Sequence, residues 1–179
     1  WRLAPIRGLV QWALRLSAQQ AQAVVSVCRE IPQWMQQEWG IEAARCRVIR
    51  NGVDPSACFP HDKADARRRL GLSQDRPYIG FVGGFFPWHG LDTLVEAMAL
   101  VRHECPTAML LLVGDGQTRP ALEALVRQRG LEEVVSLVGR VEFDEVPWWI
   151  GASDLCVVLH RPVRFYPGDS MKLWEYMAC

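Results

Sequence analysis

Residues 78–90, with the sequence YIGFVGGFFPWHG, decide the fold of this chain. The segment opens with an apolar run that favours a β-strand, and it breaks at Gly83 and Gly84 into a turn. After Pro87 it meets LDTLVEAMALV, which has the apolar spacing of a helix. A strand, a glycine turn and a helix in this order allow a backbone to approach a phosphate closely.

Three more apolar runs follow this segment, and helical patterns lie between them. We expect strands at residues 78–82, 109–113, 134–138 and 155–159, and helices at about 91–104, 120–129, 144–151 and from about 170 onward. Strands that are apolar throughout and alternate with helices are typical of a parallel sheet buried on both faces. The sequence therefore predicts an α/β fold with a Rossmann-like parallel sheet and helices on both faces.

The first part of the chain shows the same alternation in shorter form. Residues 1–23 have the pattern of an amphipathic helix, which we expect to pack on a sheet rather than to lie on a membrane surface. Short strands are expected at 23–27 and 47–50, and a helix beginning at Pro32 lies between them.

The composition indicates an ordinary globular protein. The chain has 179 residues, half of them apolar, and its formal net charge is zero. A nucleic-acid partner is not expected, because such a surface needs a basic excess. The six cysteines form no CxxC pair and have no histidine at metal-ligand spacing, so we expect reduced structural thiols in a cytoplasmic protein and no metal site. No apolar run approaches the ~20 residues of a membrane span, and both ends read as cut within expected helices, so we expect a fragment.

In a parallel α/β sheet, ligands bind beyond the carboxyl ends of the strands. Glycines stand at three of the four predicted ends: Gly83 and Gly84, Gly114 and Gly116, and Gly139. The GxGxxG pattern of a dinucleotide site and the GxxxxGK[ST] pattern of a P-loop are both missing. Phosphate binding would therefore rest on backbone N–H groups and nearby cations. Arg140 is one such cation, although a loop arginine can also be simply solvated.

The last expected helix begins with groups that suit an anion. Ser170 supplies a capping hydroxyl, Met171 and Lys172 follow it, and the Lys172 side chain adds an ammonium group. Glu175 lies one turn further on, so it could form a surface ion contact of little energetic value with Lys172. Alternatively, Lys172 meets a phosphate while the two oxygens of Glu175 accept hydrogen bonds from a ribose diol. The spacing alone leaves both interpretations open.

Six landmarks occur in a fixed order: NGVD at 51–54, then FVGGFFPWHGLDTLVEA, LLLVGDG, VSLVGRV, EVPWWIGASD and KLWEYMAC. This series resembles the retaining, nucleotide-sugar-dependent glycosyltransferases of the GT-B fold, in the group often called family four. The resemblance implies two Rossmann-like domains. Residues 1–56 would be the C-terminal part of the N-terminal, acceptor domain with its linker, and residues 57–179 would be a donor-binding domain that is incomplete at its C-terminus.

The residues that clamp the donor in this family are only partly matched. Gly84 and His89 stand where the family usually has the arginine and lysine that hold the donor diphosphate. Glu175 matches the glutamate that holds the nucleotide ribose, whereas Pro167 replaces a glutamate that touches the donor sugar. We therefore expect Lys172 and an arginine of the preceding loop to supply the missing positive charge.

Together, the pattern and the resemblance give a set of candidate donor-binding residues. They are Gly83, Gly84, His89, Gly114, Gly116, Arg140, Ser170, Met171, Lys172 and Glu175, with Arg161 or Arg164 as the helping cation. No cofactor is implied beyond the nucleotide-diphosphate sugar, which is a co-substrate, and no carboxylate pair is placed to bind a metal. The catalytic groups are expected in sequence that precedes this chain.

The resemblance implies transfer of a sugar to an acceptor hydroxyl with retention at the anomeric carbon, in polysaccharide or glycoconjugate synthesis. The acceptor would be a carbohydrate or a lipid-linked molecule. The protein would be cytoplasmic, with peripheral association at the inner face of the membrane as a further option. Two alternatives stay open: a non-catalytic nucleotide-binding module of the same fold, which the missing cations favour, and a sugar-nucleotide epimerase. The fragment alone is expected to be inactive.

Several other residues have a structural interpretation beside a functional one. Trp88, Trp148 and Trp149 could stack on a sugar ring, although one of Trp148 and Trp149 also suits a core position. Asp115 could cap the helix that follows it. We expect His160 to be structural and the three arginines at 67–69 to form a solvated helix face.

Overall fold

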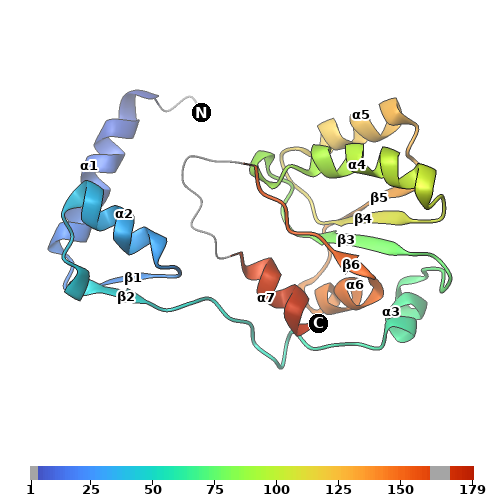
Figure 1. The fold of residues 1–179 in the computed structure, drawn as a ribbon, viewed down its shortest axis with the longest axis horizontal. Coiled ribbons are helices and arrows are strands. Elements are labelled where there is room, and N and C mark those ends of the chain that lie inside the picture. Colours follow the sequence, from blue (N-terminus) through green and yellow to red (C-terminus); the bar gives the residue numbers. More distant parts are fainter. Residues whose placement is uncertain (1–3, 162–169) are drawn as a thin grey trace. The chain divides into compact units, whose positions relative to one another are not determined.

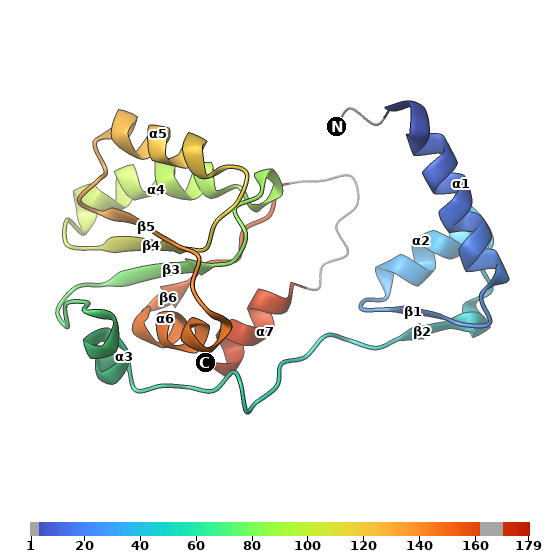
Figure 2. The ribbon, with the colours of Figure 1, turned by 180° about the vertical axis from the view of Figure 1, so that it is seen from behind.

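The computed structural model describes residues 4–161 and 170–179. These residues form two compact units, the first ending at Gly52 and the second beginning at Val53. Figures 1 and 2 show the elements of both units from opposite sides. The roles expected for residues 1–56 and 57–179, as acceptor-side and donor-binding parts, stay predictions.

The first unit has a small parallel sheet and two helices. Helix α1 (Ala4–Gln20) precedes strand β1 (Val24–Ser26), which pairs with strand β2 (Cys46–Val48). Helix α2 (Glu30–Trp39) and the 3-10 helix η1 (Ala43–Arg45) connect the two strands. Both predicted strands are therefore present, in shorter form.

Helix α1 does not bury the apolar face that its sequence pattern predicts. Leu9, Trp12 and Leu14 are all exposed. The helix is attached at its C-terminal end, where the Arg45 guanidinium donates a hydrogen bond of 2.9 Å to the carbonyl oxygen of Gln19. The expected packing of this face on a sheet is therefore wrong for the part of the chain that the structure describes.

The second unit is built on a four-stranded parallel sheet in the order β5–β4–β3–β6. Its strands are β3 (Tyr78–Val82), β4 (Met109–Val113), β5 (Val135–Gly139) and β6 (Leu155–Cys156). The bounds of β3 and β4 match the prediction, because each is a continuous apolar run followed by glycine. Strand β6 is shorter than predicted, since only Leu155 and Cys156 pair with β3.

Helices cover both faces of this sheet, as the apolar strands predict (Figures 1 and 2). One face has α4 (Leu91–Glu104) and α5 (Arg119–Arg129), and the other has α3 (Lys63–Leu70), α6 (Val146–Ala152) and α7 (Met171–Ala178), with the 3-10 helices η2 (Pro87–His89) and η3 (Phe143–Glu145) before α4 and α6. In β4, Leu110 and Leu112 belong to one core cluster, whereas Leu111 and Val113 belong to the other. The predicted α/β fold is therefore confirmed.

The arginines at 67–69 do not form a uniformly solvated face. Arg67 is only 5% exposed. Its guanidinium donates to the carbonyl oxygens of Ala152 at 3.0 Å and Gln74 at 2.8 Å, and to the carboxylate of Asp154 at 2.6 Å. A buried charge is tolerated when it is paired and fully hydrogen-bonded. This network ties α3 to the segment between α6 and β6, and the prediction for Arg67 is wrong.

Candidate functional site

A pocket of about 300 Å³ lies at the carboxyl ends of β3 and β4, where the sequence places a ligand site. Its lining residues are Val82, Gly83, Gly84, Phe86, Val113, Gly114, Asp115, Arg140, Val141 and Val146. The structure thus brings four of the candidate residues to one pocket: Gly83, Gly84, Gly114 and Arg140. We call this space the glycine pocket.

The glycines of the pocket allow the ends of three strands to touch. The Gly83 N–H donates to the carbonyl of Val113 at 2.9 Å, and the Gly114 N–H donates to the carbonyl of Gly139 at 2.7 Å. Gly114 has φ = 133°, and a Cβ there would overlap the carbonyl oxygen of Gly83. Any side chain at position 114 would therefore push the two turns apart.

Gly116 does not line the glycine pocket. It lies against Phe85, in the turn that follows β3. A Cβ on Gly116 would stand 2.7 Å from the carbonyl oxygen of Phe85. Asp115, which was expected to cap α5, accepts a hydrogen bond from the Gly116 N–H at 2.7 Å instead. Thr118 is the residue at the N-cap of α5, and its hydroxyl donates to the Phe85 carbonyl at 3.0 Å. The capping prediction for Asp115 is therefore wrong.

His89 is held inside the turn that follows β3. It is 7% exposed, and its Nδ1 lies 2.6 Å from the carbonyl oxygen of Gly84. Because a carbonyl oxygen only accepts, Nδ1 bears the proton. Burial lowers the pKa of His89, and the nearby Lys172 and His160 lower it further. The ring is therefore neutral at neutral pH, and the one hydrogen bond that it can donate goes to the backbone.

Two aromatic rings cover the outside of the same turn. Phe86 and Trp88 stack with centroids 4.7 Å apart and planes 9° apart, and they are 39% and 37% exposed. The Phe86 ring occupies the space that a Cβ on Gly84 would need. A ring therefore fills the position beside residue 84 where the resembling family has an arginine side chain.

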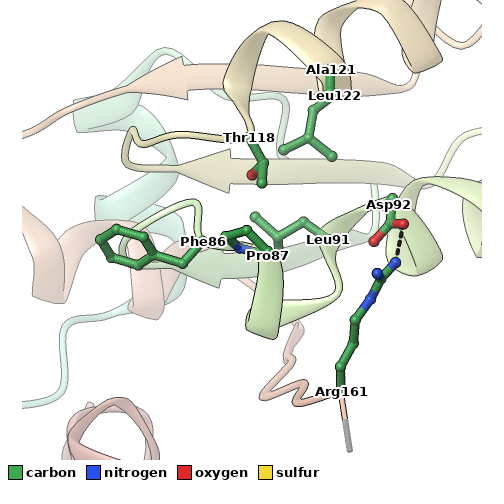
Figure 3. Close-up of a pocket in the computed structure, with 8 residues that line it drawn as sticks. All are labelled: Phe86, Pro87, Leu91, Asp92, Thr118, Ala121, Leu122 and Arg161. Atoms are coloured by element: carbon green, nitrogen blue, oxygen red, sulfur yellow. Dashed lines mark hydrogen bonds and ion pairs between the residues drawn. The ribbon is translucent and has the colours of Figure 1, made fainter. Parts of the chain in front are cut away.

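A second pocket, of about 150 Å³, shares Phe86 with the glycine pocket (Figure 3). It is lined by Phe86, Pro87, Leu91, Asp92, Thr118, Ala121, Leu122 and Arg161. Arg161 forms an ion pair with Asp92, which Figure 3 shows as a dashed line. Arg161, one of the two expected helping cations, is therefore engaged at this second pocket. The other, Arg164, and also Pro167 lie outside the described residues.

Helix α7 brings its one lysine to the glycine turn. The Nζ and Cε atoms of Lys172 lie so close to Gly83 that a Cβ on this glycine would be 2.9 and 2.8 Å from them. The Nζ also lies 5.3 Å from the centroid of the Phe81 ring. Burial lowers the pKa of Lys172, and the negative charge of Glu175 acts in the opposite direction. The expected proximity of Lys172 to the paired glycines is therefore observed.

The remaining candidates on α7 are less closely connected with the pocket. Ser170 is the N-cap residue, but its side chain makes no capping hydrogen bond, and Met171 is exposed. Glu175 lies near Cys58 and Cys179; burial raises the pKa of both thiols, and the negative charge of Glu175 raises it further. Among the described residues, none of α7 lines the glycine pocket.

Tyr176 is a residue of this site that the sequence reasoning missed. Its hydroxyl accepts a hydrogen bond from the Val82 N–H at 2.8 Å and donates one to the Val82 carbonyl at 3.2 Å. Strand β6 pairs with β3 only as far as Gly80, so the phenol takes the place that a longer β6 would have. The sequence signal that could have identified Tyr176 is its spacing. It follows Lys172 by four residues and therefore lies on the same face of the helix.

Trp148 is not available as a platform for a sugar. One of its contacts is a stacked His61 ring with a centroid distance of 3.5 Å, and another is the Arg69 guanidinium 4.7 Å from the ring centroid. Protein groups therefore already occupy the faces on which a sugar would stack. The prediction that His160 is structural agrees with its ring contact with His89 at 5.4 Å.

No group of three or more His, Cys, Asp or Glu side chains suited to a metal ion occurs among residues 4–161 and 170–179. In the same residues, no helix is both long enough and apolar enough to cross a membrane.

Comparison with known proteins matches both parts of the chain to one kind of enzyme. Residues 76–179 match the family described as "Glycosyl transferases group 1", and residues 1–57 match "Glycosyltransferase Family 4". The first match covers more than half of the 179 residues.

Individual relatives agree with this assignment. D-inositol 3-phosphate glycosyltransferase from Thermobispora bispora is 35% identical over 123 residues, which are 64% of this chain and 29% of that protein. Sucrose-phosphate synthase from Thermosynechococcus elongatus has a TM-score of 0.82 at 27% identity, covering 100% of this chain and 44% of that one. HepE from Anabaena in complex with UDP-glucose has a TM-score of 0.69 at 25% identity, covering 84% and 42%. The chain spans less than half the length of each.

Proposed function

The chain belongs to the group 1 glycosyltransferases of the GT-B fold, and we propose that the intact protein transfers a sugar from a nucleotide-diphosphate sugar to an acceptor hydroxyl, with retention at the anomeric carbon. The observation that supports this most directly is the position of the Lys172 ammonium beside Gly83, at the carboxyl end of β3. A cation and open backbone turns at one sheet edge suit a diphosphate.

In this proposal the donor diphosphate occupies the glycine pocket. The turns at Gly83, Gly84 and Gly114 let it approach the backbone, while Arg140 lines the pocket from the segment after β5. Lys172 approaches the same turn from α7. Negative charge develops on the diphosphate as the sugar departs, and fixed positive groups at this point lower the barrier.

Glu175 holds the nucleotide ribose in the same proposal. It lies one turn after Lys172 on α7, and a carboxylate offers two acceptor oxygens to the two adjacent hydroxyls of a ribose. Gly116, Ser170 and Met171 complete the proposed donor site through their backbones. We assign no group that acts on the sugar itself among the described residues, and we propose that this chain alone is inactive.

The donor and acceptor classes follow from the relatives by analogy. HepE was solved with UDP-glucose, which supports a nucleotide-diphosphate sugar as the donor class. The Thermobispora relative is named for a phosphorylated inositol. We propose a carbohydrate or lipid-linked acceptor, a role in polysaccharide or glycoconjugate synthesis, and a cytoplasmic location with peripheral association at the inner face of the membrane.

Incubation of the intact protein with UDP-, GDP- and ADP-sugars and a panel of acceptors tests this function. We expect sugar transfer, or slow donor hydrolysis when the acceptor is missing, with product of the same anomeric configuration as the donor. Binding without any turnover would instead establish a nucleotide-binding module, which the uncharged residues Gly84 and neutral His89 favour. A changed sugar stereochemistry in the free nucleotide sugar would establish an epimerase.

A further inference from the structure

The turn after β3 presents two aromatic rings to the surface rather than to the core. Phe86 and Trp88 form a parallel stack with ring centroids 4.7 Å apart, and each residue is more than one third exposed. We call them the aromatic pair. The neighbours Phe85 and His89 in the same turn are buried, so the exposure belongs to the aromatic pair and not to the whole turn.

The aromatic pair stands at the edge of the glycine pocket. Phe86 lines this pocket and also lines the pocket that contains Arg161, and no other described residue lines both. Figure 3 shows its ring directed away from Pro87, Leu91 and Thr118. The Phe86 ring is therefore a wall of the glycine pocket, and Trp88 lies parallel to it, stacked on one face of the ring.

In this turn, an aromatic surface that favours stacking stands where the resembling family has a charged side chain. The Phe86 ring fills the space beside Gly84, so an arginine side chain cannot extend from this position without moving the ring. A solvent-exposed pair of parallel rings offers an apolar face with a negative quadrupole. Sugar rings have a matching apolar face of C–H groups with partial positive charge, whereas a phosphate has none.

We propose that the aromatic pair binds the C–H face of a pyranose ring held at the mouth of the glycine pocket. This inference rests on the proposed function, because it requires that the pocket take a sugar nucleotide. The pyranose is either the sugar of the donor or the first sugar of the acceptor, and both present the same chemistry to the rings.

The test compares Phe86→Ala and Trp88→Ala in the intact protein with the parent protein. The probes are UDP, UDP-glucose and the acceptor found in the transfer assay. For a donor sugar, we expect the Kd of UDP-glucose to rise roughly three- to tenfold while the Kd of UDP stays constant. For an acceptor sugar, both Kd values stay constant and the KM of the acceptor rises by the same factor.

Controls separate stacking from a general disturbance of the turn. Phe143→Ala removes an exposed phenylalanine in η3 that lines neither pocket, and it should change none of these constants. Phe86→Tyr and Trp88→Phe keep the rings and should retain parental affinity. Thermal unfolding of each variant identifies a loss that comes from misfolding.

Two results would overturn the inference while the proposed function stands. One is unchanged Kd and KM values in both alanine variants, in a protein that binds UDP-glucose. The other is an equal loss of UDP and UDP-glucose, which would place the nucleobase rather than a sugar on the rings. Failure of the parent protein to bind any sugar nucleotide would overturn the proposed function and this inference together.

Discussion

Two segments meet at the carboxyl end of β3, and they provide different chemistry. The turn at residues 83–90 has glycines, aromatic rings and a neutral histidine, with no Lys, Arg, Asp or Glu. Helix α7 has Lys172, Glu175 and Tyr176 within two turns. In the resembling family the turn itself provides cations. Here the turn provides shape, and the helix provides the charge at the same sheet edge.

The largest effect should come from removing the charge on the helix. Lys172→Ala should raise the Kd of the donor by at least about tenfold, because its charge lies beside the proposed diphosphate site. Calorimetric titration with UDP and UDP-glucose measures this. Lys63→Ala is the matched control. Lys63 is the other lysine of the chain, and it lies in α3, where it forms an ion pair with Asp154. A change in the donor Kd below about twofold for Lys172→Ala would show that another group supplies the positive charge for the diphosphate.

The pH dependence of binding should follow the same lysine. Burial places the pKa of Lys172 below the ordinary lysine value, and a bound diphosphate raises it. Donor affinity should therefore be constant below the pKa of the free protein. It should then fall, by up to about tenfold per pH unit, as pH rises toward the pKa in the complex.

Titration at several pH values in the alkaline range, with matched buffers, measures this decline. In Lys172→Ala the decline should disappear, because no proton is then taken up on binding. A parental curve that is flat up to the ordinary lysine pKa would contradict an ammonium that is partly desolvated.

A smaller effect should come from Tyr176→Phe, which removes both hydrogen bonds to Val82. The helix face that bears Lys172 then loses its anchor to the end of β3. We expect roughly a fivefold rise in the donor Kd, with a loss of stability of about 1–2 kcal/mol. In the Lys172→Ala background the same substitution should leave the Kd unchanged, because its effect acts through the lysine.

Tyr78→Phe is the control for this experiment. Tyr78 is buried at the opposite end of β3, and its hydroxyl accepts one hydrogen bond from the Ser73 N–H at 3.0 Å. It should reduce stability without a change in donor affinity. Equal losses of affinity in Tyr78→Phe and Tyr176→Phe would indicate a general loosening of the sheet and not a positioning role for Tyr176.

The smallest effect should come from an attempt to restore the charge of the turn. Gly84→Arg should change the donor Kd by less than about twofold, because the Phe86 ring occupies the space that the new side chain needs. Gly84→Arg combined with Phe86→Ala frees that space and should bind the diphosphate more tightly than Phe86→Ala alone. A tenfold gain in donor affinity from Gly84→Arg by itself would show that the Phe86 ring moves aside at little cost. The turn could then carry the charge as well as the helix does.

The sequence predicts those features of the fold that depend on neighbouring residues. The sequence predicts β3 and β4 residue by residue, because a short run of apolar residues, interrupted in β3 only by Gly80, ends at a glycine in each. The end of β6 was missed, since the run LCVVL looks like a full strand and only the position of Tyr176 shows what replaces it. Arg67 was misjudged because its partners Ala152 and Asp154 lie far away in sequence.

The candidate site follows the same rule. The meeting of Gly83, Gly114 and Arg140 could be predicted, because strand ends of a parallel sheet share one edge. The hydrogen bond from His89 to the Gly84 carbonyl could not, since it depends on the exact path of the turn. The contact of the Phe86 ring with Gly84 depends on a side-chain rotamer, which no sequence pattern specifies.

The contact between Gly114 and the Gly83 carbonyl has a consequence for how such a protein can diversify. A single added methyl group at position 114 would separate two adjacent turns, so we expect this position to require glycine. Rings, charges and hydroxyls around it can be exchanged among the turn, the helix and the loop without altering that spacing. The groups that contact a ligand can therefore differ in chemistry while the distance between the two backbones stays constant.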